Sequence, residues 1–473
     1  MRGIVLFIWM FPIWAAAQGM YVSEPLTIRN DYGYELIGRL RDRILVFRDK
    51  YDEYEIQAYD QQMHAVWNKE LRDIDKRGVQ ILAVTTGKND FSVLYSRRRR
   101  GHVQLLLHKY DPMANLIDTF TIKDYGERVF NVPRLKHLES EDRNCMVVYN
   151  EEESGKFEVT CFRVDKMLVL WDRVLDKARV DTDIHADEKV LTNEGVLFLI
   201  EEKNNRRSKL DEHGFTIASV RAGEELTFVT VPAPQLITSD VLFKYDQTQQ
   251  RLAGAGLYGD KHRERVNGTF SFYYTPRTAA STGIQMQAFD EQFLSVVRQK
   301  NVDDEGKGIL DARLSDILLR QDGGIVLVAE RYHEVMRGAA ATRGFWRDGS
   351  RLVVDYYYDD LLIVTTHPDG KVHWKTVLHK KQYSQDDEGT FSSYFPFLNA
   401  DKLRFLFNDE IKYENTCSEY VINPFGDFDR NSLLNTEGQA LRLRFRDARQ
   451  MSSGECLVPS EFRNKLRFVL LRF

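Results

Sequence analysis

Residues 34–71 have the sequence YELIGRLRDRILVFRDKYDEYEIQAYDQQMHAVWNKEL, and the fold is predicted from the pattern of this segment. It contains four short runs in which apolar and polar residues alternate, and the polar turns RD, KYDE and QQM separate these runs. Alternation with a period of two is typical of β-strands that bury one face. Short polar turns between such runs indicate hairpins. The stretch therefore predicts one antiparallel sheet of four strands.

This unit recurs along the chain, with copies that begin near positions 34, 78, 131, 184, 238, 314 and 393. A repeat of roughly 40 to 50 residues with four strands is the spacing of propeller blades. The sequence thus predicts an all-β, seven-bladed β-propeller of four-stranded antiparallel blades over residues 18–473. Such a ring needs a seal between its first and last blades. Two segments can supply it, the final run KLRFVLLRF (465–473) and the early segment YVSEPLTI (21–28).

The first 17 residues have the pattern of a secretory signal peptide. Arg2 is basic, residues 4–14 are apolar, and Ala15–Ala17 provide the small residues of a cleavage site. The apolar run is too short for a permanent membrane anchor. We therefore expect an exported, soluble protein in the periplasm, at the outer-membrane surface or outside the cell.

Charge and cysteine content limit the partners further. The 66 Lys and Arg residues nearly balance the 71 Asp and Glu residues, and the formal net charge is −5. This balance argues against a nucleic-acid-binding protein. In an oxidising compartment the four cysteines can form disulfides, and the sequence leaves open whether they are bridged or are small buried thiols. These cysteines are Cys145, Cys161, Cys417 and Cys456.

Loops that join the second and third strands of each blade are expected to emerge on the same end of the ring. Four of these loops carry clustered basic residues, and the longest belong to blades five, six and seven. Loops longer than about 12–15 residues are often functional, and clustered charge steers association with an anionic partner; the alternative interpretation is a set of solvated hairpin tips. The predicted contact residues are Arg263, Arg265, Arg337, Arg343, Trp346, Arg347, Arg351, Phe425 and Phe428.

Motifs that carry chemistry are absent from the sequence. It has no GxSxG elbow, no zinc spacing of Cys or His and no spaced calcium loop, so we predict no metal site, no cofactor and no catalytic residue. We therefore favour a monomeric binding or scaffold module of the cell envelope, whose partner is an envelope protein, an anionic glycan or a lipid head group. The alternative is a glycan-active hydrolase or lyase with an acidic site in the propeller funnel.

Two resemblances accompany the repeat. The segments AYDQQMHAVW (58–67), RVDKMLVLW (163–171) and HPDGKVHW (367–374) resemble blades of quinoprotein-like propellers, without the Thr-Gly of that motif in the first two. Residues 314–409 resemble exported, uncharacterised propeller-like proteins of Gram-negative bacteria. The second resemblance implies a periplasmic or outer-surface setting and brings no catalytic residues.

Overall fold

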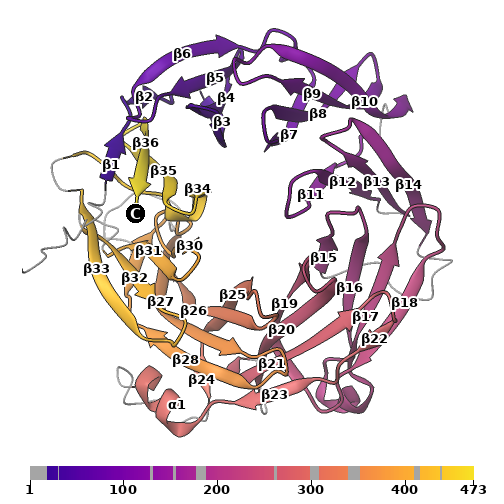
Figure 1. The fold of residues 1–473 in the computed structure, drawn as a ribbon, viewed down its shortest axis with the longest axis vertical. Helices are drawn as coiled ribbons and strands as arrows, with labels where there is room; N and C mark the ends of the chain where they lie inside the picture. Colours follow the sequence, from indigo (N-terminus) through magenta and orange to yellow (C-terminus); the bar gives the residue numbers. More distant parts are fainter. Residues whose placement is uncertain are drawn as a thin grey trace, which may run out of the picture.

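The protein is a ring of eight sheets around a central opening (Figure 1). The computed structural model describes residues 19–29, 31–127, 132–152, 156–176, 188–259, 264–298, 308–338, 352–409, 416–436 and 439–473. In each of the first seven sheets the strands follow chain order from the opening outward. The predicted signal peptide, residues 1–17, lies outside the described residues.

The first four blades are regular four-stranded sheets. Blade one contains β3 (Asp31–Leu40), β4 (Arg43–Lys50), β5 (Tyr54–Tyr59) and β6 (Ala65–Glu70). Blade two contains β7 (Val79–Thr86), β8 (Phe91–Arg99), β9 (His102–Tyr110) and β10 (Leu116–Glu127). Blade three contains β11 (Lys136–Glu139), β12 (Cys145–Glu151), β13 (Lys156–Arg163) and β14 (Leu168–Asp176). Blade four contains β15 (Glu188–Leu191), β16 (Leu197–Lys203), β17 (Gly214–Val220) and β18 (Thr227–Pro232), with the 3-10 turn η2 (Arg207–Glu212) before β17.

Blades five and six carry additions to this plan, whereas blade seven is regular. Blade five contains β19 (Ile237–Asp246), β20 (Arg251–Gly259) and β21 (Arg265–Thr275). The outer edge of β21 pairs with three short strands, β22 (Ala280–Ser281), β23 (Gln285–Ala288) and β24 (Ile309–Leu310). Helix α1 (Glu291–Arg298) follows β23. Blade six contains β25 (Ala312–Leu319), β26 (Ile325–Gly338), β27 (Leu352–Thr366), β28 (Val372–Leu378) and β29 (Gln382–Gln385). Blade seven contains β30 (Phe395–Leu398), β31 (Leu403–Asn408), β32 (Thr416–Ile422) and β33 (Phe428–Asn435).

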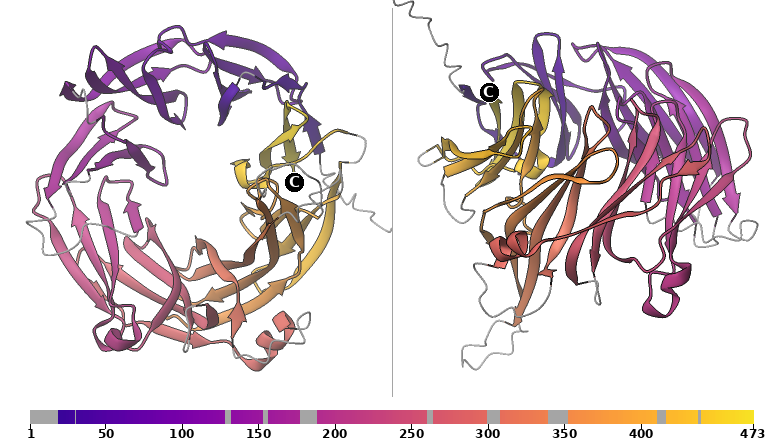
Figure 2. Two further views of the ribbon diagram at one scale, coloured as in Figure 1. Left: turned by 180° about the vertical axis from the view of Figure 1, so that it is seen from behind. Right: turned by 60° about the horizontal axis from the view of Figure 1, so that its bottom comes forward.

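The prediction of seven blades was wrong, because the chain forms an eighth blade from both of its ends. The C-terminal part gives three strands, β34 (Arg449–Ser452), β35 (Glu455–Phe462) and β36 (Lys465–Arg472), preceded by the 3-10 turn η3 (Phe445–Asp447). The fourth strand is β1 (Gly19–Val22), which pairs with β36, and β2 (Leu26–Thr27) pairs with the same strand. Both candidate seals therefore act together, and Figure 2 shows the yellow C-terminal strands beside the indigo N-terminal ones.

Eight buried clusters hold the ring, one at each boundary between neighbouring blades. At the boundary of blades eight and one, for example, Phe468 of β36 packs against Tyr34 and Tyr59 with ring centroids 5.8 and 5.7 Å apart. Alternating apolar residues face a neighbouring sheet on both sides of a blade, so each blade stabilises the next. Within the described residues, no helix is long and apolar enough to span a bilayer.

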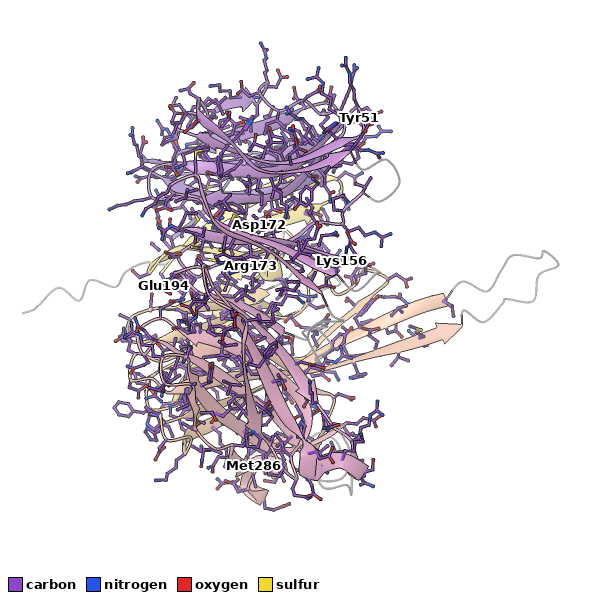
Figure 3. The ribbon with its side chains drawn as sticks, turned by 90° about the vertical axis from the view of Figure 1, so that its right-hand side faces the viewer. Tyr51, Lys156, Asp172, Arg173, Glu194 and Met286 are labelled. Carbon is purple, nitrogen blue, oxygen red and sulfur yellow. The ribbon has the colours of Figure 1, made fainter. Side chains whose placement is uncertain are left out.

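The two ends of the ring carry different loops. Because the strands are antiparallel and sequential, the loops after second strands open at one end, and those after first and third strands open at the other. In Figure 3, Tyr51 and Lys156 lie on the end from which the long hairpin of β26 and β27 projects, and Glu194 lies at the opposite end. We call the end with the hairpin the hairpin end.

Candidate functional site

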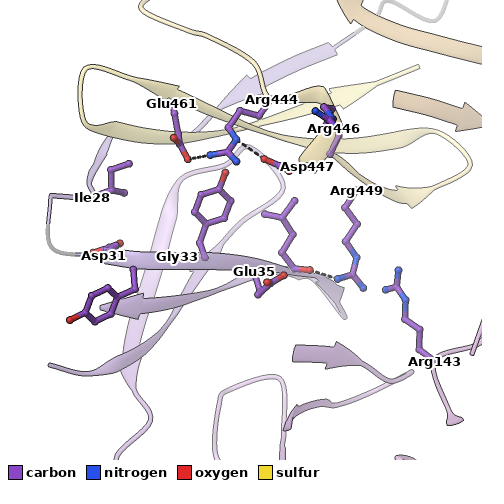
Figure 4. A pocket seen from close by; sticks show the side chains of 14 residues that line it. Ile28, Asp31, Gly33, Glu35, Arg143, Arg444, Arg446, Asp447, Arg449 and Glu461 are labelled. Atoms are coloured by element: carbon purple, nitrogen blue, oxygen red, sulfur yellow. Dashed lines mark hydrogen bonds and ion pairs between the residues drawn. The ribbon is translucent and has the colours of Figure 1, made fainter. Parts of the chain in front are cut away.

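A cavity of about 700 Å³ lies beside the inner strands of blades one and eight. Its wall consists of the segment before β3 and the first half of β3, the residues of η3 and the start of β34, the end of β35, and one side chain from blade three. That side chain is Arg143, in the turn between β11 and β12 (Figure 4). The lining residues are Ile28, Asp31, Tyr32, Gly33, Tyr34, Glu35, Leu36, Arg143, Arg444, Arg446, Asp447, Ala448, Arg449 and Glu461.

Two irregularities in β3 shape this wall. The pairing of β3 with β4 shifts register between Asp31 and Gly33 and again between Leu36 and Gly38. A β-bulge leaves one residue unpaired and redirects its neighbours, and bulges often lie beside functional sites. Gly38 has a φ of +104°, a region that favours glycine, so the second bulge depends on this residue.

The second bulge turns backbone oxygens of β3 toward Arg449 of blade eight. The guanidinium of Arg449 donates to the Leu36 carbonyl oxygen, and its second nitrogen lies 3.0 Å from the Thr86 hydroxyl of blade two. Thr86 in turn donates to the Ile37 carbonyl oxygen. Arg449 thus joins three blades through neutral partners, and its positive charge stays available to the cavity.

The other cavity arginines differ in how far their charge is compensated. Arg444 forms ion pairs with Glu461 and, at 2.5 Å, with Asp447. Arg446 contacts a neutral group, the hydroxyl of Tyr358, at 3.4 Å. Arg143 lies 4.0 Å from the carboxylate of Glu139, the outer limit of an ion pair. Arg143, Arg446 and Arg449 are therefore the side chains that can bind an anion here.

Two carboxyl groups lie close to these arginines. The Glu35 side chain is exposed to the cavity, and desolvation by the cavity wall, followed by the charges of Glu139 and Asp447, raises its pKa. Burial also raises the pKa of Glu139, which Arg143 and His137 partly oppose. Within the described ranges no group of three or more His, Cys, Asp or Glu side chains is arranged to hold a metal ion.

Of the four predicted contact residues that the structure describes, two lie at the hairpin end of the ring and two at the opposite end. Arg337, near the end of β26, forms an ion pair with the buried carboxylate of Asp355, and Arg265 begins β21. Phe425 and Phe428 lie at the turn between the third and fourth strands of blade seven, at the end opposite the hairpin end. Their placement in one long loop, residues 409–438, was wrong, because β32 and β33 lie inside that span. Five predicted residues lie outside the described ranges: Arg263, Arg343, Trp346, Arg347 and Arg351.

The four cysteines are buried and carry free thiols. Cys145 and Cys161 lie on neighbouring strands, and their sulfur atoms approach the carbonyl oxygens of Asn193 and Gly195 at 3.2 and 3.7 Å. Burial raises the pKa of the Cys145 thiol to about 11, so this thiol is not prepared for nucleophilic chemistry. Disulfide formation remains a prediction.

Sequence reasoning missed the cavity because it looked for charge in the hairpin loops. The arginines of the segment LRLRFRDAR (441–449) alternate with apolar residues, a pattern typical of a strand with one charged face. That pattern could have indicated Arg444 and Arg446. The contribution of Arg143, some 300 positions earlier in the chain, carries no local signal.

No known protein family and no curated protein matches the chain. Among solved structures it is similar to a prolyl endopeptidase, with 11% identity over 84% of this chain and a TM-score of 0.35, and it spans 55% of that protein's length. It is also similar to the β-propeller domain of the Trilobed protease from Pyrococcus furiosus, with 9% identity, 88% of this chain and 99% of that one covered, and a TM-score of 0.37. It is similar to the polysaccharide lyase Uly1 as well, with 8% identity over 82% of this chain and 89% of that one, and a TM-score of 0.37. Likenesses this distant assign no activity to the chain.

Proposed function

We propose that the protein binds an anionic, hydroxyl-rich ligand, an acidic oligosaccharide, in the cavity between blades one and eight. The observation that carries this proposal is the pair Arg446 and Arg449, which line one concave site while their contacts are with neutral groups. Arginine is well suited to a carboxylate because its planar fork donates two parallel hydrogen bonds. The cavity volume lies within the range of small-ligand sites.

The mixed charge of the wall favours a saccharide over a phosphate-dense ligand. Glu35 and Asp447 face the same space as the arginines, and their negative charges would repel closely spaced phosphates. The hydroxyl groups of a sugar can donate to such carboxylates, while an isolated carboxylate on the sugar meets the arginines Arg143, Arg446 and Arg449. An acidic sugar can therefore interact favourably with both the carboxylates and the arginines of the wall.

The test is titration calorimetry with oligosaccharides that contain uronic acid and with neutral oligosaccharides of the same length. We expect Arg446→Gln and Arg143→Gln each to weaken binding of the acidic ligand by about tenfold or more, since a hydrogen bond to a charged group contributes roughly 1.5–3 kcal/mol. The matched control is Arg72→Gln, because the Arg72 side chain is 85% exposed and outside the cavity. Equal binding of acidic and neutral ligands would refute the proposal.

A second candidate function is cleavage of the same ligand by a hydrolase or lyase reaction. The observation that favours it is the raised pKa of Glu35 and of Glu139 beside the cavity, since a carboxyl group that keeps its proton toward neutral pH can act as a general acid. Product analysis after long incubation tests it. In that case Glu35→Gln abolishes product formation and leaves binding in place, whereas absence of any product from the wild-type protein excludes this candidate.

Export remains part of the proposal. A signal peptide over residues 1–17 would place the protein in the periplasm or at the cell surface, where acidic polysaccharides are available. Cell fractionation and N-terminal sequencing of the mature protein test this setting. Recovery of the full-length chain in the cytoplasm would refute it.

A further inference from the structure

We propose that the ligand chain continues out of the cavity over an aromatic rim formed by Tyr32 and Tyr51, so that the site recognises an oligomer rather than a single acidic sugar. This inference rests on the proposed function. Tyr32 lines the cavity, and the rings of Tyr32 and Tyr51 lie 6.0 Å apart at an angle of 45°. Both side chains are 68% exposed.

The backbone accounts for the outward direction of both rings. Tyr32 is the residue left unpaired by the first bulge of β3, between Asp31 and Gly33. Tyr51 lies in the turn between β4 and β5, at the hairpin end of the ring (Figure 3). Two adjoining tyrosines thus reach water from two separate irregular segments, although large aromatic side chains usually bury most of their surface.

Lys76 supports the rim. Its ammonium nitrogen lies 5.4 Å from the ring centre of Tyr32 and 3.9 Å from that of Tyr54, and it pairs with the carboxylate of Asp49. A cation against the face of a ring restrains that ring. The contact limits the orientations of the Tyr32 ring, and such pre-ordering lowers the entropy cost of binding.

The rim has the chemistry of a saccharide platform. The C–H groups on one face of a sugar ring pack against an aromatic face, and the tyrosine hydroxyls can exchange hydrogen bonds with sugar hydroxyls. A neighbouring pair of rings offers surface to successive units of one chain. With its acidic end on Arg449 or Arg143, an oligosaccharide leaves the cavity past Tyr32 and then reaches Tyr51.

The experiment measures affinity against ligand length. Wild-type protein is titrated with uronic acid monomer, dimer, tetramer and hexamer, and the same series is applied to Tyr32→Ala, Tyr51→Ala and the double variant. We expect wild-type affinity to rise with length. Tyr51→Ala should weaken tetramer binding about two- to tenfold while monomer binding is unchanged, in line with roughly 0.5–1.5 kcal/mol for an aromatic contact. Tyr32→Ala should weaken tetramer binding more than monomer binding, because Tyr32 also lines the cavity. The control is Phe425→Ala, because Phe425 is 79% exposed at the opposite end of the ring.

The outcomes separate this inference from the proposed function. If saccharides bind with an affinity independent of length, or if Tyr51→Ala weakens monomer and tetramer binding equally, the rim is not a subsite, and the cavity proposal stands. If no acidic saccharide of any length binds the wild-type protein, the proposed function fails and the inference fails with it. Thermal melting of the variants verifies that their fold is intact.

Discussion

Replacing Phe468 by alanine tests the closure of the ring directly. Phe468 is fully buried between blades eight and one, and its ring meets Tyr34 and Tyr59 edge-on. The backbone N–H of Phe468 donates to the Ser23 hydroxyl at 2.9 Å and so ties β36 to the N-terminal segment. The side chain therefore stabilises the one boundary at which the two ends of the chain meet.

The expected loss is large because the site is tightly packed. A buried Phe→Ala replacement costs about 3–5 kcal/mol in the free energy of unfolding, and two aromatic contacts place Phe468→Ala in the upper part of that range. Urea denaturation followed by tryptophan fluorescence measures this free energy. The matched control is Phe425→Ala, whose exposed ring should change stability by less than about 0.5 kcal/mol.

The same variant should weaken ligand binding. Tyr34 packs on Phe468 and lines the cavity, and the guanidinium of Arg444 lies 5.9 Å from the centre of the Tyr34 ring. Loss of Phe468 therefore loosens one wall of the site. If Phe468→Ala lowers the free energy of unfolding by less than about 1 kcal/mol, the view that this boundary closes the ring is refuted.

Three further outcomes are expected. Val46→Asp should prevent stable folding, because Val46 is fully buried and an unpaired charge there has no partner, whereas Asp52→Lys in a turn should leave the melting temperature unchanged; expression and thermal melting compare them. Lys380→Met should cost about 3–5 kcal/mol, because it leaves the carboxylate of Glu330 buried without its partner at 2.5 Å, and urea denaturation measures this loss. Glu35→Gln should reduce a pH dependence. Because desolvation raises the pKa of Glu35 above 4.5, the wild-type carboxyl takes up a proton as pH falls toward that value, and the folded state then gains stability and binds the acidic ligand more tightly. Both gains should be smaller in the variant, in which Glu139 still titrates with a raised pKa, and calorimetry and melting across this range measure them.

The all-β class and the four-stranded unit can be read from the amino-acid sequence, because alternation and turns act within a single hairpin. All seven predicted starts fall near the first strand of a real blade, as β3 and β25 illustrate. The alternation in RILVFRD (43–49) and IVLVAERY (325–332) predicts that Val46 and Leu327 face the core, and both side chains are buried.

The eighth blade and the cavity could not be predicted in this way, because both depend on contacts between distant parts of the chain. The last three strands lack a fourth in chain order, and β1 completes them from more than 400 positions away. The cavity likewise combines Glu35, Arg143 and Arg449 from three blades, and it forms only after the ring has closed. The physical reason is that strand pairing within a blade is local and leaves a periodic trace in the sequence, whereas contacts across the central opening join distant residues and leave none.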